Sequence, residues 1–409
     1  MFIYLIYVKH MIKLIILKYS KSQFMTESEF LLTNINNSVF FKEFTFSQNE
    51  LRHPSGNTKE LADNVVWIDD LLIVYQVKGR ERSHIRDTNS EEKWFEKKVE
   101  TVAKKQVRDT ISFFKTYNSL PVKNDRGQEI DIAEAKVHQL IKMIVYDPKS
   151  ELLDHKRKLK FLESRTVGMI HLFHIDDYAM ICKKLVTPSE LSEYLEFREE
   201  MFLKHKSAIG ARREEYLLGH FITTTNTLEI NDEYTKNIDK ISPLTPSSDV
   251  SWILNNFFKN LVTFSGGKET DYHHVIKEIA KLNREELKAF NERYYSAIEQ
   301  VRKNDFGFPF RFTSSKTGCG FVFIGLQLTQ KAYWENALFN FTEIYKYKHK
   351  LNRCIGVVVY KDEEYIQINW ALLRGSWIYN KILEEYVNSE SEYYPKSEIN
   401  FLPRYPLEP

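Results

Sequence analysis

The stretch ELADNVVWIDDLLIVYQVK, residues 60–78, holds two apolar runs that meet at a pair of aspartates. The runs 65–68 and 71–77 consist largely of β-branched, aromatic and aliphatic residues, and Asp69-Asp70 between them predicts a tight turn. The segment is therefore expected to form a β-hairpin. The second run is nearly continuous in apolar residues, which is typical of a strand covered on both faces of a sheet.

The expected hairpin register brings three polar side chains together. Counting outward from the turn pairs Ile68 with Leu71 and places Asp63 opposite Gln76. Directly paired residues have Cβ atoms about 4.5–5.5 Å apart. Lys78 lies two residues beyond Gln76 and so points to the same face. A carboxylate, an amide and an amine are therefore predicted to converge at the end of a buried strand.

These residue types suit metal-assisted phosphodiester hydrolysis. Asp63, the amide oxygen of Gln76 and the carbonyl of Val77 are hard oxygen ligands of the kind that Mg²⁺ or Mn²⁺ takes together with water. A bound divalent ion polarises a phosphodiester and activates water. Lys78 can donate to the attacking water or to charge that develops on the phosphate. The catalytic residues that this reasoning predicts are Asp63, Gln76 and Lys78.

The pattern resembles the PD-(D/E)XK nuclease superfamily. Asp63 matches the first Asp of the motif, and QVK at 76–78 matches its (D/E)XK element in a Gln variant that looks like Mrr-type restriction endonucleases. The basic helix that follows, with KKQVR at 104–108, is also similar. The resemblance covers residues 25–205, and it implies a mixed β-sheet core flanked by helices and a metal-dependent endonuclease.

The chain departs from the family pattern at two positions. Ala62 stands where the motif has Pro, and Gln76 replaces an acidic residue. The resemblance implies that a Glu from the first helix adds a metal ligand. The candidates are Glu27, Glu29 and Glu43, with Glu29 preferred. Glu60 is a further candidate, which the resemblance adds to the predicted catalytic residues. The alternative is a solvated strand end in which Lys78 merely pairs with Asp63.

The rest of the chain predicts an α/β protein, a mixed β-sheet flanked by helices with a second α+β domain. Helices are expected at 27–36, 90–117, 284–303 and 330–350, and one begins at Thr187-Pro188 and runs to about 206. Strands are expected at 136–146, 165–175, 309–313, 320–326, 354–360 and 364–370. The predicted domains are an extended start or disordered segment (1–24), a nuclease domain (25–205), a linker region (206–250) and an accessory or recognition domain (251–409).

Two groups of basic residues could follow a phosphate backbone. The predicted nucleic-acid-binding residues are Lys97, Lys104, Lys105 and Arg108 on the helix at 90–117, and Lys156, Arg157 and Lys158 in a segment expected to be a loop. The alternative for both groups is an ordinary solvated surface. His171 and His174 have a spacing that places them on opposite faces of a strand, so they are predicted to be structural rather than joint metal ligands.

Composition narrows the class of protein. The chain has 58 Lys and Arg against 56 Asp and Glu, so any DNA-binding surface must be a local patch of positive charge. The spacing of its three cysteines matches no zinc motif. No apolar run reaches a membrane span, so a cytoplasmic protein without membrane contact is expected. The leading hypothesis is a Mg²⁺-dependent DNA endonuclease of bacterial restriction or anti-phage defence, for which cleavage of both strands would favour a homodimer. The alternative is a catalytically inactive nucleic-acid-binding or scaffold subunit of a defence complex.

Overall fold

The computed structural model describes residues 25–52, 58–80, 87–137, 139–148, 152–241 and 268–389, with residues 250, 253 and 405. The predicted segment 1–24 lies outside these ranges. The chain divides into two compact units, residues 1–182 with 201–214, and residues 183–200 with 215–409. The division crosses helix α7 (Pro188–Lys204).

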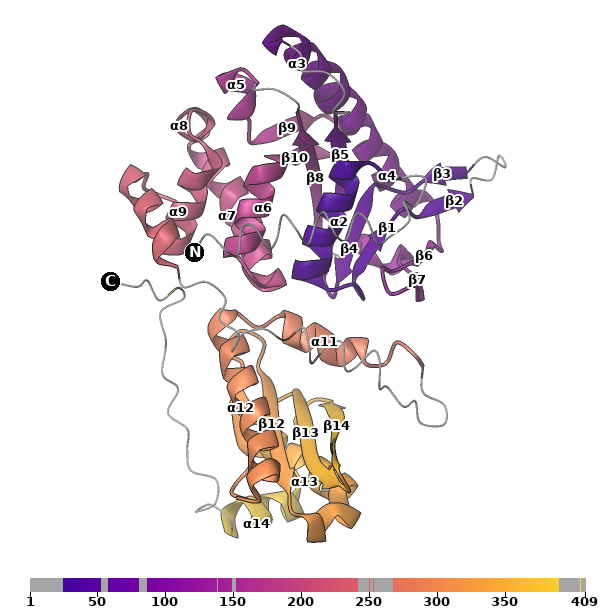
Figure 1. The fold of residues 1–409 in the computed structure, drawn as a ribbon, viewed down its shortest axis with the longest axis vertical. Coiled ribbons are helices and arrows are strands. Elements are labelled where there is room, and N and C mark those ends of the chain that lie inside the picture. Colours follow the sequence, from indigo (N-terminus) through magenta and orange to yellow (C-terminus); the bar gives the residue numbers. More distant parts are fainter. Residues whose placement is uncertain are drawn as a thin grey trace. The chain divides into compact units, whose positions relative to one another are not determined.

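The first unit is a mixed α/β arrangement, as predicted (Figure 1). Its elements in chain order are α2 (Glu27–Phe40), β1 (Thr45–Ser47), β2 (Glu50–Arg52), β3 (Thr58–Glu60), β4 (Asn64–Ile68), β5 (Leu71–Gly79), α3 (Thr88–Trp94), the π-helix η1 (Phe95–Ala103), α4 (Lys104–Thr116), β6 (Pro121–Lys123), β7 (Glu129–Asp131), the 3₁₀ helix η2 (Ala133–Val137), β8 (Gln139–Asp147), α5 (Asp154–Arg157), β9 (Phe161–Ser164), β10 (Gly168–His174), α6 (Ile175–Lys184) and α8 (Lys206–Gly210).

The central sheet has the strand order β1-β4-β5-β8-β10-β9. Strands β5, β8 and β10 run parallel, and the remaining pairs are antiparallel. The predicted hairpin register is confirmed, because Ile68 pairs with Leu71 and Trp67 with Leu72. Residues 71–77 are all buried, as expected for a central strand.

Helices cover both faces of this sheet (Figure 1). Leu72 and Val74 of β5 pack in one core cluster with Phe113 and Phe114 of α4. Side chains alternate along a strand, so Tyr75 points to the opposite face, where its hydroxyl meets Tyr178 of α6. Helix α2 also lies against β4 and β5.

The helix predicted at 90–117 is present, but its middle is a π-helix. Its buried stripe also differs from the one that its apolar spacing predicts, which consists of Trp94, Val99, Val102, Val107 and Ile111. The buried positions are Phe95, Val99, Ala103, Val107 and Ile111, four residues apart throughout, whereas Trp94 and Val102 are only partly buried. On an α-helix a four-residue step drifts by about 40° per turn. The wider π turn reduces this drift and keeps the stripe against β8 and β10.

Two segments differ from their predicted form. The basic segment expected to be a loop contains a short helix, α5. The predicted linker region contains α8, α9 (Glu214–Thr223) and the 3₁₀ helix η3 (Asp232–Lys240). Buried side chains in α9, among them Leu217 and Phe221, explain why this polar-looking stretch is ordered.

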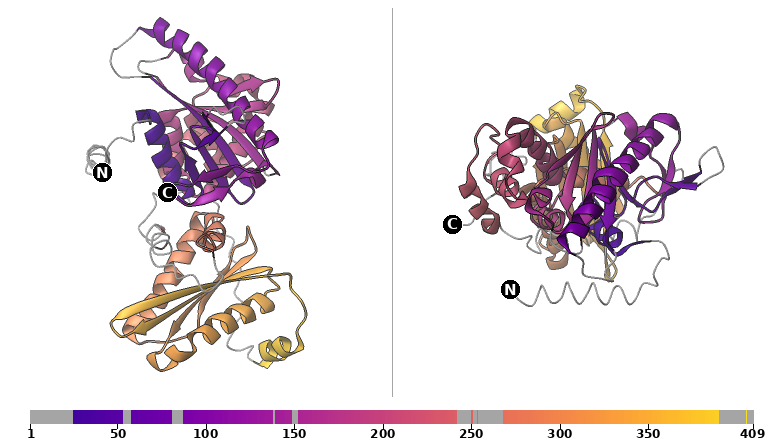
Figure 2. Two further views of the ribbon diagram at one scale, coloured as in Figure 1. Left: turned by 90° about the vertical axis from the view of Figure 1, so that its right-hand side faces the viewer. Right: turned by 90° about the horizontal axis from the view of Figure 1, so that it is seen from above.

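The second unit has its own four-stranded sheet, in the order β11-β12-β13-β14. Besides α7 and α9, its elements are α11 (His273–Ala280), α12 (Arg284–Lys303), β11 (Phe310–Thr313), β12 (Cys319–Leu326), the 3₁₀ helix η5 (Leu328–Tyr333), α13 (Trp334–Lys348), β13 (Arg353–Asp362), β14 (Tyr365–Arg374) and α14 (Lys381–Ser389). Helix α12 packs on one face through Phe290 and α13 on the other through Leu338 and Tyr345 (Figure 2). The predicted strands and helices of this unit are confirmed.

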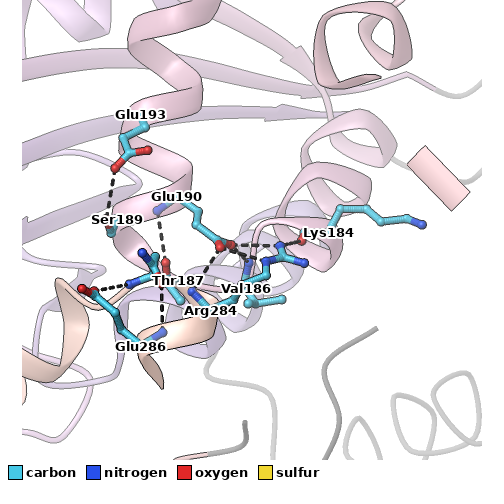
Figure 3. A network of polar contacts seen from close by, with 9 residues as sticks. Lys184, Val186, Thr187, Ser189, Glu190, Glu193, Arg284 and Glu286 are labelled. Atoms are coloured by element: carbon cyan, nitrogen blue, oxygen red, sulfur yellow. Dashed lines mark hydrogen bonds and ion pairs between the residues drawn. The ribbon is translucent and has the colours of Figure 1, made fainter. Parts of the chain in front are cut away.

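A buried ion pair fastens α7 to α12 inside this unit (Figure 3). The Glu190 carboxylate accepts from Arg284 Nε at 2.9 Å and from Arg284 Nη2 at 3.0 Å. The predicted helix start is also confirmed, since the Glu190 main-chain N–H donates to Thr187 Oγ1. In the described parts of the chain, no helix is both long enough and apolar enough to cross a membrane.

Candidate active site

Asp63 lies immediately before β4 and is almost fully buried, with 6% of its surface exposed. Strand β4 begins at Asn64, which pairs with Tyr75, so the main chain of β5 has no strand partner beyond that point on this side. The Asp63 carboxylate supplies the missing acceptor, because the Val77 N–H donates to Asp63 Oδ2 at 2.5 Å. The local fold therefore fixes this carboxylate at the end of the hairpin.

The Lys78 side chain lies at the same end of the hairpin as the Asp63 carboxylate. Its Nζ lies 3.4 Å from Asp63 Oδ2 and donates to the Val77 carbonyl oxygen at 2.6 Å. The N–H and C=O of one strand residue point to the same side, so both Val77 groups face the gap left by β4. The structure thus brings Asp63, Val77 and Lys78 together around one cationic position, which the Lys78 ammonium fills.

Two glutamates lie close enough to Asp63 for their charges to interact. Glu60 is an exposed residue, but partial burial of its carboxylate, then the charges of Asp63 and Glu29, raise its pKa to about 7. Burial also raises the pKa of Asp63; Lys78 and the Val77 N–H lower it, and Glu29 raises it further. Crowded carboxylates of this kind attract a cation.

Of the first-helix glutamates, the preferred candidate Glu29 is the one that lies near the site. Its carboxylate also accepts from the Thr26 N–H at 2.8 Å in a capping box that begins α2. The prediction of Glu43 as a first-helix residue is wrong, because α2 ends at Phe40, and the Glu43 side chain is buried in an ion pair with Arg126 at 2.8 Å. Glu27 is exposed on the first turn of α2.

The raised pKa of Glu60 predicts a pH-dependent stability. The folded chain binds this proton more tightly than the unfolded chain, whose Glu has its ordinary pKa of 4.5, so the free energy of unfolding should fall as pH rises from about 4.5 to about 7. Glu60→Gln removes this titration. Its free energy of unfolding, relative to that of the native chain, should therefore rise between pH 4.5 and 7 and stay at a constant difference above pH 7. Urea unfolding in EDTA measures this, and a difference that stays constant with pH would contradict it.

Gln76 is buried, with 2% exposure, and its side chain points to the same sheet face as Lys78. Among the described residues its Oε1 has no hydrogen-bond partner, and neither has Oε1 of Gln106 on α4. Buried amide oxygens are rarely left in this state in proteins, and an ion or a water is a common explanation. Gln106 belongs to the KKQVR segment but was not predicted as a site residue.

The oxygen donors at this end of β5 are of the kind that a divalent ion takes together with several waters. Within the described ranges, no group of three or more His, Cys, Asp and Glu side chains is arranged to hold a metal. An ion here would instead rely on Asp63, the Val77 carbonyl and the Gln76 amide, with Glu60 and Glu29 beside them. Magnesium accepts one or two carboxylates with neutral oxygens and water.

A buried polar network holds the hairpin and α2 in place behind the site. Tyr75 bonds to Tyr178, which donates to Asn36 Oδ1, and Asn36 donates to Asn64 Oδ1, each at 2.8 Å. Asn64 and Tyr75 are the chain neighbours of Asp63 and Gln76. The network was not predicted; its only sequence signal is Asn36, a polar residue on the buried side of helix 27–40.

Helix α2 also approaches β5 closely at the site. A Cβ atom on Gly79 would lie 2.2 Å from Ser28 Oγ and 2.8 Å from Ser28 Cβ. Ser28 is itself held by a hydrogen bond to Asp147 Oδ2 at 2.7 Å. The glycine after Lys78 thus allows the first turn of α2, with Glu29, to reach the end of β5.

The two predicted basic groups differ in their surroundings. Lys156 pairs with Glu100 at 2.9 Å, Lys158 with Asp154 at 2.5 Å, and Arg157 binds both oxygens of Asp177. Burial lowers the pKa of Lys156, but Glu100 and Glu96 outweigh this and raise it. These three side chains are therefore already engaged with carboxylates.

On the helix, by contrast, Lys97, Lys105 and Arg108 are exposed, and Lys104 is partly exposed. In the described parts of the chain none of these four makes an ion pair. Lys105 and Arg108 are neighbours on the surface of α4 because they are three residues apart. Thr110, on the next turn, donates to the Leu61 carbonyl at 2.6 Å and so ties this helix to the segment that carries Asp63.

No protein-family model matches the chain, and no curated protein or solved structure matches it. The resemblance to the PD-(D/E)XK superfamily therefore remains a prediction from the motif.

Proposed function

We propose that the first unit is a metal-dependent endonuclease that hydrolyses phosphodiester bonds of DNA. The observation that carries the proposal is the convergence of Asp63 and Lys78 at the end of β5, with the crowded carboxylates of Glu60 and Glu29 beside them. A restriction or anti-phage role rests on the resemblance to Mrr-type enzymes. In this proposal the binding partner is DNA, and the chain acts in the cytoplasm.

Each site residue has a distinct role in this proposal. Asp63, Val77 and Gln76 would hold Mg²⁺ or Mn²⁺, which when bound would polarise the phosphodiester and activate water. Lys78 would leave the Val77 carbonyl and donate to the oxygen on which negative charge develops. Cleavage of both strands by sites of this kind would favour a homodimer.

A second candidate is a nuclease-fold subunit that binds nucleic acid without cutting it. Two observations favour it: Gln76 stands where a carboxylate would strengthen metal binding, and the Lys78 ammonium is held between Asp63 and the Val77 carbonyl. Plasmid cleavage with Mg²⁺ or Mn²⁺, compared with EDTA, separates the two candidates. Metal-dependent nicking supports the enzyme, whereas DNA binding without nicking or metal binding supports the subunit.

The exposed helix predicts the salt dependence of DNA binding. Replacing Lys105 and Arg108 together with Ala should reduce the slope of log K against log salt by about 0.9 for each phosphate that these side chains neutralise. Lys158→Ala is the matched control, and its slope should stay unchanged because Lys158 is paired with Asp154. Fluorescence anisotropy of a labelled duplex measures both slopes. Equal reductions in the two variants would extend the DNA surface to α5 and contradict the expected difference between the two basic groups.

A further inference from the structure

A row of side chains continues the candidate site across the sheet. Lys78 of β5 pairs with Tyr146 of β8, and Tyr146 pairs with His174 of β10. These strands are parallel, so the three residues lie at the same level and on the same face, at the carboxyl ends of the strands. Neighbouring strands are about 4.8 Å apart, which places the backbone of His174 about 10 Å from that of Lys78. Ligands of open α/β sheets bind at this edge.

His174 is held in one orientation. Its ring meets the Tyr146 ring edge-to-face with centroids 5.4 Å apart, and Tyr146 in turn packs against Phe95. The Asp176 N–H donates to His174 Nδ1 at 3.1 Å, so Nδ1 is an acceptor and the proton of the neutral ring lies on Nε2. The structure records no partner for Nε2 among the described residues, and 13% of the side chain is exposed.

Burial, more than the surrounding charges, favours the neutral form of the His174 ring. Burial and then the Arg157 guanidinium lower the pKa of His174, while Asp176, Asp177 and Asp147 oppose them. Asp177 is already bound by Arg157, and Asp147 accepts from Ser28. His174 therefore offers a neutral N–H donor at the strand ends, not a positive charge.

We propose that His174 contacts the DNA strand that passes the Asp63–Lys78 site, with Nε2–H donating to a phosphodiester oxygen. The inference rests on the proposed function, because it assumes that DNA lies across the ends of β5, β8 and β10. The backbones of Lys78 and His174 are about 10 Å apart, so the two contacts would fall on different phosphates of one strand. The contact would fix the direction in which the strand crosses the site.

Two variants of the full chain test the donor. His174→Phe keeps a ring against Tyr146 and removes the N–H, whereas His174→Gln keeps an amide donor near the position of Nε2. Binding of a labelled DNA duplex is measured by anisotropy in EDTA, so that the readout does not depend on cleavage. His174→Phe should weaken binding about threefold to tenfold, and His174→Gln should restore most of it. Because the imidazole is neutral, the salt slope should stay unchanged in both.

The outcomes separate this inference from the proposed function. Native-like binding by His174→Phe overturns the contact and leaves the nuclease proposal standing. Equal weakening by His174→Phe and His174→Gln, or a reduced salt slope in either, also overturns it, because the effect would then come from packing or from charge. If the unaltered chain neither binds nor cleaves DNA, the proposed function falls and the contact falls with it.

Discussion

Replacing Lys78 with methionine is expected to lower metal-dependent DNA cleavage by about 10²- to 10³-fold, as when one donor to developing charge is removed from an active site. The Lys78 ammonium lies 3.4 Å from Asp63 and is only 15% exposed. Methionine preserves the unbranched apolar stem and deletes the donor. The rate of nicking of supercoiled plasmid in Mg²⁺ or Mn²⁺ measures the loss, and Lys98→Met, which replaces an exposed residue of the helix 88–116, is the matched control.

Metal binding by the same variant separates a catalytic lysine from a structural one. In the native chain the Lys78 ammonium donates to the Val77 carbonyl and approaches Asp63, so it competes with a divalent ion for these oxygens. Lys78→Met should therefore bind Mn²⁺ as tightly as the native chain or more tightly, whereas Asp63→Ala should lose this binding. Unchanged cleavage by Lys78→Met would place the activity elsewhere. Weak Mn²⁺ binding by both variants would indicate that Lys78 only supports the fold of the corner.

The hairpin and its polar corner were predictable because their determinants are local. Two apolar runs and the turn at Asp69-Asp70 set the register, and this register places Asp63 opposite Gln76, on the face to which Lys78 also points. The strands of the second unit were predictable for the same reason, since turn residues separate clear apolar runs. Local patterning of this kind needs no knowledge of the tertiary structure.

What could not be predicted depends on partners far away in the sequence. The carboxylates that engage Lys156 and Arg157, at Glu100 and Asp177, are 56 and 20 residues away. The network through Asn36 joins residues up to 142 positions apart. The π-helix keeps buried residues that are four positions apart against the sheet, and this spacing can be interpreted only when the sheet is known. In each case the sequence shows a polar or apolar residue, and packing decides its role.

The largest stability effect is expected from Glu190 in the second unit. Its side chain is 3% exposed, accepts from Arg284 and also accepts from the Val186 N–H at 3.1 Å, while Arg284 donates to the Lys184 carbonyl at 2.6 Å (Figure 3). Burial lowers the pKa of Arg284, but Glu190 raises it above its usual value. Glu190→Ala would leave this guanidinium buried without its carboxylate.

Glu190→Ala should therefore lower the free energy of unfolding of the second unit by about 3–5 kcal/mol, the usual effect of removing one partner of a buried ion pair. Urea unfolding, combined with hydrogen exchange of peptides from α7 and α12, measures the change where the pair lies. Arg302→Ala, which breaks the exposed pair with Glu299 on the same helix, should change stability by less than about 1 kcal/mol. The double variant Glu190→Leu with Arg284→Met should recover much of the loss, because no buried charge is left unpaired. A double variant as unstable as Glu190→Ala would contradict this explanation. The loss of stability would then come from the other hydrogen bonds of Glu190, such as the one with the Val186 N–H, and not from the unpaired guanidinium.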